Sequence, residues 1–287
     1  MSMGFSIYGG TGNIGSYFIG LYGGRPLQRR QLAPMDEEVL YLISTTSNSY
    51  TDPLLHTDTN IDALMKRLVA CQEAGVKTFN FVSSWFVYGL HQGLMKEEDP
   101  CMPKGLYSIT KRCAEQLVID YCSHHGIAWR ILRLGNVYGG LDISNGQRNA
   151  LHYIIQELKA SRPVEGVGGM RRDYIHIYDT CRAIQHVCKE GERNCIYNIG
   201  SGRSTFLSHC ISYCKEMLQS KSIVSYRTLR NDEQSLVMAL DCTKLFNTGF
   251  SPLISLEEGL ADLCTNQKFS TPLHFSMGTK SRLQLAA

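Results

Sequence analysis

Short apolar runs alternate with longer amphipathic segments over the first half of the chain. The apolar runs are rich in Val, Ile, Phe and Tyr, which is typical of buried strands. We expect strands at 5–8, 39–44, 79–84 and 128–134. Between them, apolar positions three and four residues apart predict helices at about 16–21, 61–74 and 107–124. Strands that alternate with helices predict an α/β fold in which helices cover both faces of a parallel sheet.

Beyond residue 140 the elements are shorter and less regular. We expect helices at 150–158, 180–188, 206–218 and 256–264, and strands at 172–177, 195–199 and 223–227. The pattern predicts a sheet domain over 1–140, to which part of 172–204 returns, and a smaller α+β lobe over 141–267. The weak pattern of 268–287 predicts a loose C-terminal tail.

A glycine-rich turn joins the first expected strand to the first helix. Gly9, Gly12 and Gly15 have the spacing of a dinucleotide-binding turn, in which backbone approaches a pyrophosphate at a helix N-terminus. A plain strand-to-helix turn is the alternative, because a chain with 26 glycines can produce this spacing by chance. With the strand and helix around it, the turn favours a Rossmann-type doubly wound sheet.

Two further segments carry candidate chemistry. Tyr107 and Lys111 lie one helical turn apart, so an ammonium group would favour the phenolate form of a tyrosine that acts as a base. The strand at 79–84 ends in Ser83 and Ser84, and ligands bind at the carboxyl ends of strands in open parallel sheets. A surface tyrosine and a strand-end cap are the alternative interpretations.

Composition narrows the class of protein. The net charge is +3 without long basic runs, which argues against nucleic-acid binding. The 11 cysteines include no C-x-x-C pair, so we expect neither a disulfide framework nor a metal site, and we assign His176 to strand packing. No signal segment and no run near 18 apolar residues is present, which predicts a cytoplasmic protein without membrane contact.

Six short motifs occur in one order along residues 3–265, and together they resemble the extended short-chain dehydrogenase/reductases. They are Gly9-x-x-Gly12-x-x-Gly15, Ser83-Ser84-x-x-Val87-Tyr88-Gly89, Tyr107-x-x-x-Lys111, Leu132-Arg133-x-x-Asn136-Val137-Tyr138-Gly139, Arg172-Asp173-Tyr174-Ile175-His176 and Tyr197-Asn198-Ile199-Gly200-Ser201-Gly202. The chain looks like an NAD(P)-dependent nucleotide-sugar epimerase or reductase, similar to UDP-galactose 4-epimerases and to 4-keto-6-deoxysugar reductases.

The resemblance implies three groups of site residues. Ser84, Tyr107 and Lys111 would be catalytic. The cofactor-binding residues would be Gly9, Gly12, Asn13, Ile14, Gly15, Arg29, Arg30, Ser44, Thr45, Ser83, Tyr107, Lys111 and Leu134. The second lobe would bind a nucleotide-diphosphate sugar, and the substrate-binding residues would be Ser84, Trp85, Phe86, Asn136, Asn149, Arg172 and Arg230.

The residues after Ser84 narrow the expected reaction. Similar 4,6-dehydratases carry Asp and Glu where this chain has Trp85 and Phe86, and Phe86 also replaces the Glu of decarboxylases. Neither side chain moves a proton, so we expect hydride transfer at C4 by a 4-epimerase with bound NAD or by a 4-ketoreductase with NADPH. We also expect the two rings to wall the sugar pocket. A catalytically silent NAD(P)-binding sensor or scaffold is the alternative, and a small-molecule carbonyl reductase is disfavoured.

The chain departs from the resemblance at 23–38, which replaces a strand, a helix and another strand of the family, and residues 23–34 show no strand pattern. We interpret Asp36, Glu37 and Glu38 as a solvated turn in preference to an acid that grips the ribose. Arg25, Arg29 and Arg30 suit a 2′-phosphate, which gives a weak preference for NADP over NAD.

The resemblance also bears on assembly. Helices at about 61–74 and 107–124 resemble the pair that forms a four-helix dimer interface in this family, so we expect a homodimer. Their apolar residues fall on more than one helix face, whereas packing on a sheet needs a single stripe. These residues are Leu64, Leu68, Val69, Leu117 and Val118. A wider contact within one chain is the alternative.

Overall fold

A six-stranded parallel sheet forms the centre of the protein. The computed structural model describes residues 4–45, 50–89, 93–140, 150–230 and 238–265. The strand order is β10-β6-β4-β3-β1-β2, and every neighbouring pair is parallel. The strands are β1 (Phe5–Tyr8), β2 (Arg25–Leu27), β3 (Glu38–Tyr41), β4 (Thr78–Ser84), β6 (Ala128–Leu134) and β10 (Cys195–Ile199). The predicted doubly wound α/β fold is confirmed.

Helices cover both faces of this sheet because its strands alternate two apolar sets. On one face, α1 (Asn13–Tyr22) and α6 (Ile177–Glu190) pack over residues such as Ile7, Leu40 and Leu132. On the other face, α3 (Ala63–Glu73) and α4 (Leu106–His124) pack over residues such as Tyr41 and Phe79. The helix expected at 61–74 is observed as α3, and it is preceded by α2 (Pro53–Thr57) and a π-helical turn (Asp58–Asp62).

The shortened segment forms the edge of the sheet. Residues 23–34 were expected to lack a strand, but Arg25–Leu27 pair with β1 as β2, so that expectation is wrong. The next residues turn back toward α3, where the Arg67 guanidinium donates to the carbonyl of Arg29 at 2.9 Å and the Tyr8 hydroxyl donates to that of Leu32. A three-residue strand and a tied loop therefore replace the longer connection.

The acidic residues at 36–38 are also placed differently from the expectation. Asp36 accepts a 2.8 Å hydrogen bond from Ser6, and Glu38 accepts one from Asn80 at 3.1 Å. Each carboxylate is only 12% exposed, so the interpretation as a solvated turn is wrong for these two residues, although Glu37 is exposed. Both lie at the amino ends of the strands, opposite the glycine turn, so they are far from a cofactor ribose.

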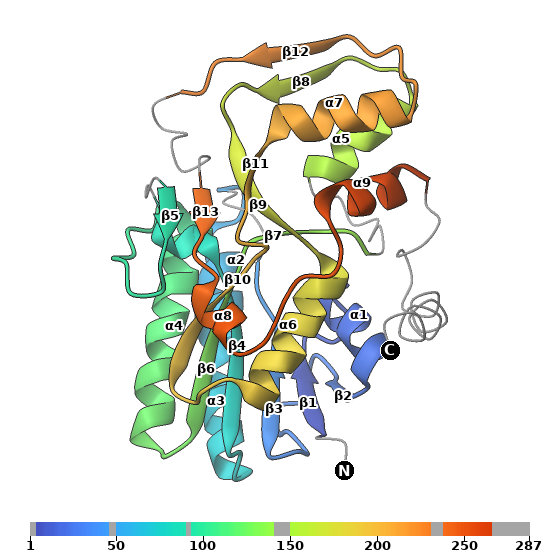
Figure 1. Ribbon diagram of the computed structural model, residues 1–287. Helices are drawn as coiled ribbons and strands as arrows, with labels where there is room; N and C mark the ends of the chain where they lie inside the picture. The colour runs from blue at the N-terminus through green and yellow to red at the C-terminus, as the bar shows by residue number, and fades with distance from the viewer. Residues whose placement is uncertain (1–3, 46–49, 90–92, 141–149, 231–237, 266–287) are drawn as a thin grey trace, which may run out of the picture.

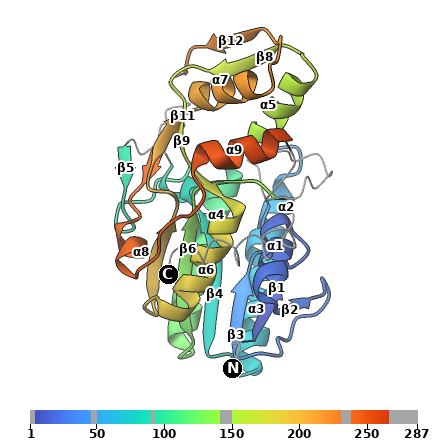
Figure 2. The ribbon, with the colours of Figure 1, turned by 45° about the vertical axis from the view of Figure 1, so that its right-hand side comes forward.

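Most of the remaining elements gather beyond the carboxyl ends of the strands, whereas the short helix α8 (Thr243–Asn247) lies beside β10 (Figures 1 and 2). They include a sheet of β11 (Ser204–Phe206), β9 (Arg171–His176) and β7 (Asn136–Tyr138), a ribbon of β12 (Val224–Arg227) and β8 (Val164–Val167), and a pair of β13 (Met238–Leu240) and β5 (Gly93–Met95). The helices are α5 (Ala150–Lys159), α7 (Leu207–Met217), α8 (Thr243–Asn247) and α9 (Leu256–Thr265). The sheet domain and the smaller lobe stay a predicted division, and the 268–287 tail lies outside the described residues.

Candidate active site

The glycine turn after β1 has the geometry that close approach to a phosphate requires. Gly9 has a φ of +82°, and its carbonyl accepts a 3.1 Å hydrogen bond from the Gly12 amide. A Cβ on Gly15 would lie 2.3 Å from the Gly9 carbonyl oxygen, so a side chain there cannot fit without a shift. Gly12 is exposed and caps α1, which leaves the helix N-terminus open to an anion. These residues fit the pyrophosphate of a dinucleotide.

The first helical residue connects this turn to the far side of the site. Asn13 donates to the carbonyl of Gly139 at 3.4 Å, and its Oδ1 is buried without a hydrogen-bond partner. Ile14 is partly buried against the core of the α1 and α6 face. The turn is thus held between β1 and the segment that follows β7.

Ser44 and Thr45 follow β3 and are fixed by a buried asparagine that sequence reasoning missed. Asn60 Oδ1 accepts from the Ser44 hydroxyl at 3.2 Å and from the Thr45 amide at 3.0 Å. Its amide nitrogen donates to Thr45 and Thr110 at 2.9 and 2.8 Å. An asparagine before an apolar helix resembles an ordinary N-cap, so no local pattern indicated that Asn60 lies in a π-helical turn and binds four groups.

Ser84 and Tyr107 meet at the carboxyl end of β4. Ser84 is the last residue of the strand, and Tyr107 lies in the first turn of α4. The Tyr107 hydroxyl is hydrogen-bonded to the side chains of Ser84 and Ser44. Burial raises the pKa of Tyr107, and these hydrogen bonds partly oppose that rise. The phenol therefore stays protonated at neutral pH until another positive charge or a bound cofactor stabilises the phenolate.

Lys111 lies one helical turn beyond Tyr107 and reaches the sheet. Its ammonium donates to the Val82 carbonyl at 2.6 Å and lies 4.2 Å from the centre of the Phe81 ring. Burial lowers the pKa of Lys111 to about 7, against the opposing influence of Glu115. Lys111 is predicted to stabilise the phenolate of Tyr107 and to bind a ribose. Binding a ribose requires an N–H group of the ammonium other than the one that it donates to Val82.

Two aromatic rings extend from the Ser84–Tyr107 pair. Phe86 is partly exposed, and its ring meets Tyr107 edge-on with centroids 5.9 Å apart. Trp85 stacks on Phe86 at 4.1 Å, and the Arg172 guanidinium lies 4.6 Å above the Trp85 ring. Trp85 is only 1% exposed, so Phe86 is the accessible member of the predicted wall.

The other predicted residues occupy varied positions. Asn136 donates to the Asp173 carbonyl at 3.4 Å beside β9. Ser83 and Leu134 are buried at the ends of β4 and β6, and the Ser83 hydroxyl has no hydrogen-bond partner. Arg29 and Arg30 are exposed after β2, and Arg230 is exposed after β12. Asn149 lies outside the described residues.

Asp173 is a second residue that sequence reasoning did not single out. Its carboxylate is fully buried and accepts hydrogen bonds from the amide and hydroxyl of Ser201, each at 2.7 Å, and from the Gly202 amide at 3.0 Å. Burial raises the pKa of Asp173 to about 6 despite these donors. It lies within a motif already identified, but only the fold shows that it holds the loop after β10.

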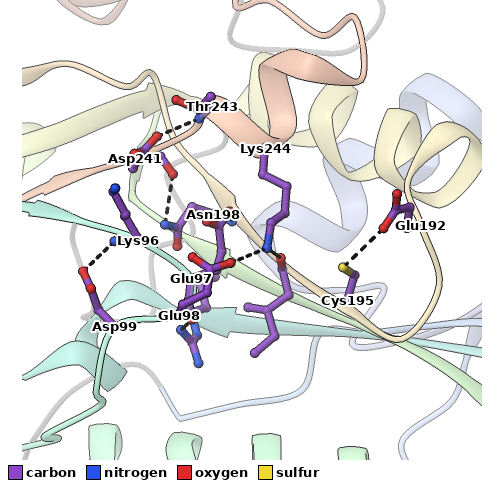
Figure 3. A network of polar contacts seen from close by, with 12 residues as sticks. Lys96, Glu97, Glu98, Asp99, Glu192, Cys195, Asn198, Asp241, Thr243 and Lys244 are labelled. Carbon is purple, nitrogen blue, oxygen red and sulfur yellow. Dashed lines mark hydrogen bonds and ion pairs between the residues drawn. The ribbon is translucent and has the colours of Figure 1, made fainter.

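A polar network connects the motif that contains Tyr88 to the motif that contains Asn198, although the two lie far apart in the sequence. Asn198 Oδ1 accepts from the Tyr88 hydroxyl at 2.8 Å, and the Asn198 amide nitrogen donates to the carbonyls of Met95 and Asp241. Glu97 accepts from the Asn198 backbone at 2.9 Å (Figure 3). The network joins β10 to β5 and to the residue that follows β13.

His176 has a capping role. Its Nδ1 accepts from the Tyr178 amide at 3.2 Å at the start of α6, and burial lowers its pKa to about 3. Packing alone, as expected from the sequence, was therefore an incomplete assignment. Among the described residues, no group of three or more His, Cys, Asp or Glu side chains could hold a metal ion. None of the helices described is both long and apolar enough to cross a membrane.

Comparison with known proteins places this geometry in a family. The sequence pattern described as "NAD dependent epimerase/dehydratase family" matches residues 31–200, which is more than half of the chain. The match begins after the glycine turn, so the turn adds an independent observation.

Curated relatives include proteins with different named reactions. The low-salt glycan biosynthesis protein Agl12 of Haloferax volcanii is 30% identical over 70% of this chain, which spans 65% of that protein's length. A dTDP-glucose 4,6-dehydratase of Streptomyces griseus is 29% identical over 81% of this chain and 72% of its own. A putative UDP-glucose 4-epimerase of Methanocaldococcus jannaschii is 28% identical over 74% and 70%.

Solved structures support the fold. A UDP-glucose 4-epimerase of Thermotoga maritima with UDP-glucose has a TM-score of 0.79 at 24% identity and covers 96% of this chain and 100% of its own. RMD of Pseudomonas aeruginosa, complexed with NADPH, has a TM-score of 0.81 at 19% identity and covers 92% and 98%. The sequence match over more than half of the chain shows that this chain belongs to the NAD dependent epimerase/dehydratase family.

Proposed function

We propose that the protein is an NAD(P)-dependent enzyme that transfers hydride at C4 of a nucleotide-diphosphate sugar, as a 4-epimerase or a 4-ketoreductase. The observation that carries this proposal is the Tyr107 hydroxyl, hydrogen-bonded to Ser84 at the carboxyl end of β4 and followed one helical turn later by Lys111. A silent sensor would not need this pair. A protein that binds NAD(P) without catalysing a reaction is the second candidate, because the segment after α1 is shorter than in the family that the chain resembles.

In the proposed reaction, Ser84 and Tyr107 hold the sugar oxygen between their hydroxyls. Tyr107 accepts the hydroxyl proton when the carbon is oxidised and returns a proton when the ketone is reduced. The cofactor, when bound, accepts or supplies the hydride. Lys111 lowers the cost of the phenolate through its charge, which matters because burial alone raises the pKa of Tyr107. The Phe86 ring helps to exclude water from the ketone.

Dehydration is the reaction that this proposal excludes, although dehydratases are among the relatives. Eliminating water across C5 and C6 needs proton transfer at those carbons as well as hydride transfer. Trp85 and Phe86 follow the serine proposed as catalytic, and neither side chain has an acid or base group that can transfer a proton at neutral pH. Incubation with dTDP-glucose and NAD, followed by NMR, tests the exclusion. A 4-keto-6-deoxy product would overturn it.

The cofactor preference is proposed on the position of two exposed arginines. Arg29 and Arg30 follow β2, the strand beside the glycine turn, and guanidinium groups bind a 2′-phosphate well. Arg25 does not support this preference, because it lies at the amino end of β2 and faces Asp36 at 3.8 Å. Calorimetric titration of both cofactors, with Arg29→Ala as a variant, checks the weak preference for NADP. Tenfold tighter binding of NAD would reverse it.

One experiment separates the two remaining activities and the silent alternative. The purified protein is denatured and any released nucleotide is identified by mass spectrometry, and the protein is then assayed by NMR with UDP-glucose and with dTDP-4-keto-6-deoxyglucose plus NADPH. Inverted C4 configuration in UDP-glucose identifies an epimerase, and NADPH oxidation with the ketone identifies a reductase. Cofactor binding without turnover on any of a wider panel of nucleotide sugars would favour the silent alternative.

A further inference from the structure

Arg67 places a positive charge inside the apolar face of the central sheet that α3 covers. It is only 6% exposed, and its guanidinium carbon lies 5.3 Å from the centre of the Tyr8 ring. One terminal nitrogen donates to the Ala63 carbonyl of its own helix at 2.9 Å, and the other donates to the Arg29 carbonyl at 2.9 Å. Its Nε is buried without a hydrogen-bond partner, so an apolar residue would suit this position better if packing were the only requirement.

The segment that Arg67 holds leaves the sheet beside the glycine turn. β2 runs parallel to β1, with Leu27 opposite Tyr8, the last residue before that turn. A Cβ on Gly10 would lie 2.8 Å from the Cβ of Pro26. Residues 28–32, here called the post-β2 segment, therefore begin at the edge of the sheet where the glycine turn lies.

Two side chains anchor the backbone of the post-β2 segment. Arg67 binds the carbonyl of Arg29, and the Tyr8 hydroxyl donates to the carbonyl of Leu32. The Arg67 guanidinium also lies over the Tyr8 ring, so the two anchors support each other. The segment contains a hydrogen-bonded turn, closed at 2.9 Å. Residues that belong to no strand or helix are thus fixed both from the sheet and from α3.

The post-β2 segment occupies the position that would border the adenosine of a dinucleotide. In a sheet of this type, residues after the second strand lie beside the adenosine ribose when the pyrophosphate is at the glycine turn. Both anchors bind carbonyls, and the side chains of Arg29 and Arg30 are exposed. A segment that is fixed before the cofactor arrives loses less conformational entropy when the cofactor binds.

We propose that Arg67 is a positioning residue, which fixes the post-β2 segment as one wall of the adenosine half of the cofactor site. The proposal rests on the function proposed above and adds a residue that acts through the backbone of Arg29. Loss of Arg67 should therefore weaken binding of the adenosine half, with little effect on binding of the nucleotide sugar. An arginine with a purely structural role would lower stability without this asymmetry.

Arg67→Met tests this inference by calorimetry, with Arg67→Lys as the conservative variant and Arg130→Met as the matched control. Arg130 is also buried, and it donates to the Gly191 carbonyl at 2.9 Å, but that loop precedes β10 at the opposite edge of the sheet. We expect Arg67→Met to raise the Kd of NADPH or NADH, and of ADP, by about 5- to 30-fold, and that of UDP by less than about twofold. Arg67→Lys should restore part of the affinity. Arg130→Met should be less stable and yet bind ADP like the wild type.

Tyr8→Phe is a milder variant, which keeps the aromatic ring beside Arg67 and removes the hydroxyl bound to Leu32. It should retain the folded core even if Arg67→Met does not. We expect it to raise the Kd of ADP by about 2- to 5-fold, because one of the two anchors remains.

Limited proteolysis follows the post-β2 segment without any ligand. Trypsin can cleave after the exposed Arg29 and Arg30, and after the exposed Arg193 in the loop that Arg130 holds. Cleavage of a native loop depends on its local opening. We expect Arg67→Met to speed cleavage at residues 29 and 30 by about tenfold or more and to leave cleavage at 193 unchanged, whereas Arg130→Met should do the reverse.

The outcomes separate this inference from the proposed function. Wild-type affinity for ADP in folded Arg67→Met and Tyr8→Phe variants, or unchanged cleavage at residues 29 and 30, would overturn the positioning role and leave the proposed function standing. Equal losses of ADP and UDP affinity would also overturn it, since they would indicate a general loss of structure. If neither NADPH nor NADH binds the wild-type protein, the proposed function fails, and this inference fails with it.

Discussion

At the scale of single residues, the candidate chemistry depends on the partly buried Tyr107 and the buried Lys111, and desolvation shifts the pKa of each so that its charged form is disfavoured. Burial raises the pKa of Tyr107 and lowers the pKa of Lys111 to about 7. Each shift disfavours a charged form, the phenolate of Tyr107 or the ammonium of Lys111. These two opposite charges would stabilise each other. A negative cofactor phosphate nearby would favour the ammonium, and the ammonium would favour the phenolate.

Tyr107→Phe should remove the acid/base and keep the ring against Phe86. We expect kcat to fall by roughly 10²- to 10⁴-fold, the usual contribution of a positioned acid or base, with cofactor affinity little changed. Tyr121→Phe in the same helix is the matched control and should retain full activity. Full activity of Tyr107→Phe on the true substrate would rule out the assigned mechanism.

The titration of Lys111 should make the free energy of unfolding depend on pH. Its pKa is about 7 in the folded protein and about 10.4 in an unfolded chain. Between these values the unfolded state binds the extra proton, so the free energy of unfolding rises with pH, and below pH 7 the full penalty of burying the charge is present. We expect this slope in urea unfolding of the wild type. A Lys111→Met variant with the same slope would contradict it.

At the scale of elements, the sequence predicted the parts that repeat a regular pattern and missed the parts that depend on distant contacts. The strands at 5–8, 128–134 and 195–199 were predicted with the observed bounds because each is rich in apolar β-branched and aromatic residues. The three residues of β2 were missed, since Arg-Pro-Leu, of which only Leu27 is buried, has no strand pattern and forms a strand only because β1 pairs with it.

The same distinction holds within the candidate site. Ser84, Tyr107 and Lys111 were singled out by the motifs that carry the family resemblance, and the fold brings the first two into hydrogen-bond contact. Asn60 and Asp173 act through partners far away in sequence, and no local pattern encodes such contacts.

The glycine turn provides a prediction about α1. In Gly15→Ala the new Cβ would meet the Gly9 carbonyl at 2.3 Å, so the turn must shift, and we expect cofactor affinity to fall at least tenfold. Gly20→Ala lies in the same helix at an exposed position, where alanine should stabilise the helix by about 0.5–1 kcal/mol. Isothermal calorimetry and thermal unfolding of both variants provide the comparison. Equal cofactor affinity in the two variants would contradict the assigned role of the turn.

The π-helical turn gives a second prediction at this scale. Asn60→Ala leaves Thr45 and Thr110 without their buried partner, which should cost about 1–3 kcal/mol of unfolding free energy. It should also loosen Ser44, which is bonded to Tyr107, and so reduce kcat. Asn247→Ala at the exposed end of α8 is the control. A stable, fully active Asn60→Ala variant would show that the turn does not depend on this residue.

At the scale of the whole molecule, the predicted homodimer has less apolar surface than the sequence suggested. Leu64, Leu68 and Val118 are fully buried in the core of their own chain, so they are unavailable to a partner. Val69 remains 40% exposed on α3, and Ile109 is 48% exposed on α4. Contacts within one chain, which were the alternative interpretation, therefore account for some of the apolar residues that lie on more than one helix face.

The dimer remains a prediction with a direct measurement. Light scattering at micromolar concentration should give twice the chain mass of 32.2 kDa, and Val69→Lys should shift the protein toward monomer. Lys66→Glu, at an exposed position one turn away, serves as a control for charge change alone. A monomer in the wild type, unchanged by cofactor, would refute the dimer.

The three-residue strand β2 affects how readily copies of the protein aggregate through the edge of the sheet. It is the outermost strand of a parallel sheet, and an open edge of this kind can template pairing with another chain. The strand is short, its central residue Pro26 has no N–H to offer, and its first residue is a charged Arg25. The same truncation that removes part of the connection thus leaves an edge that resists edge-to-edge aggregation.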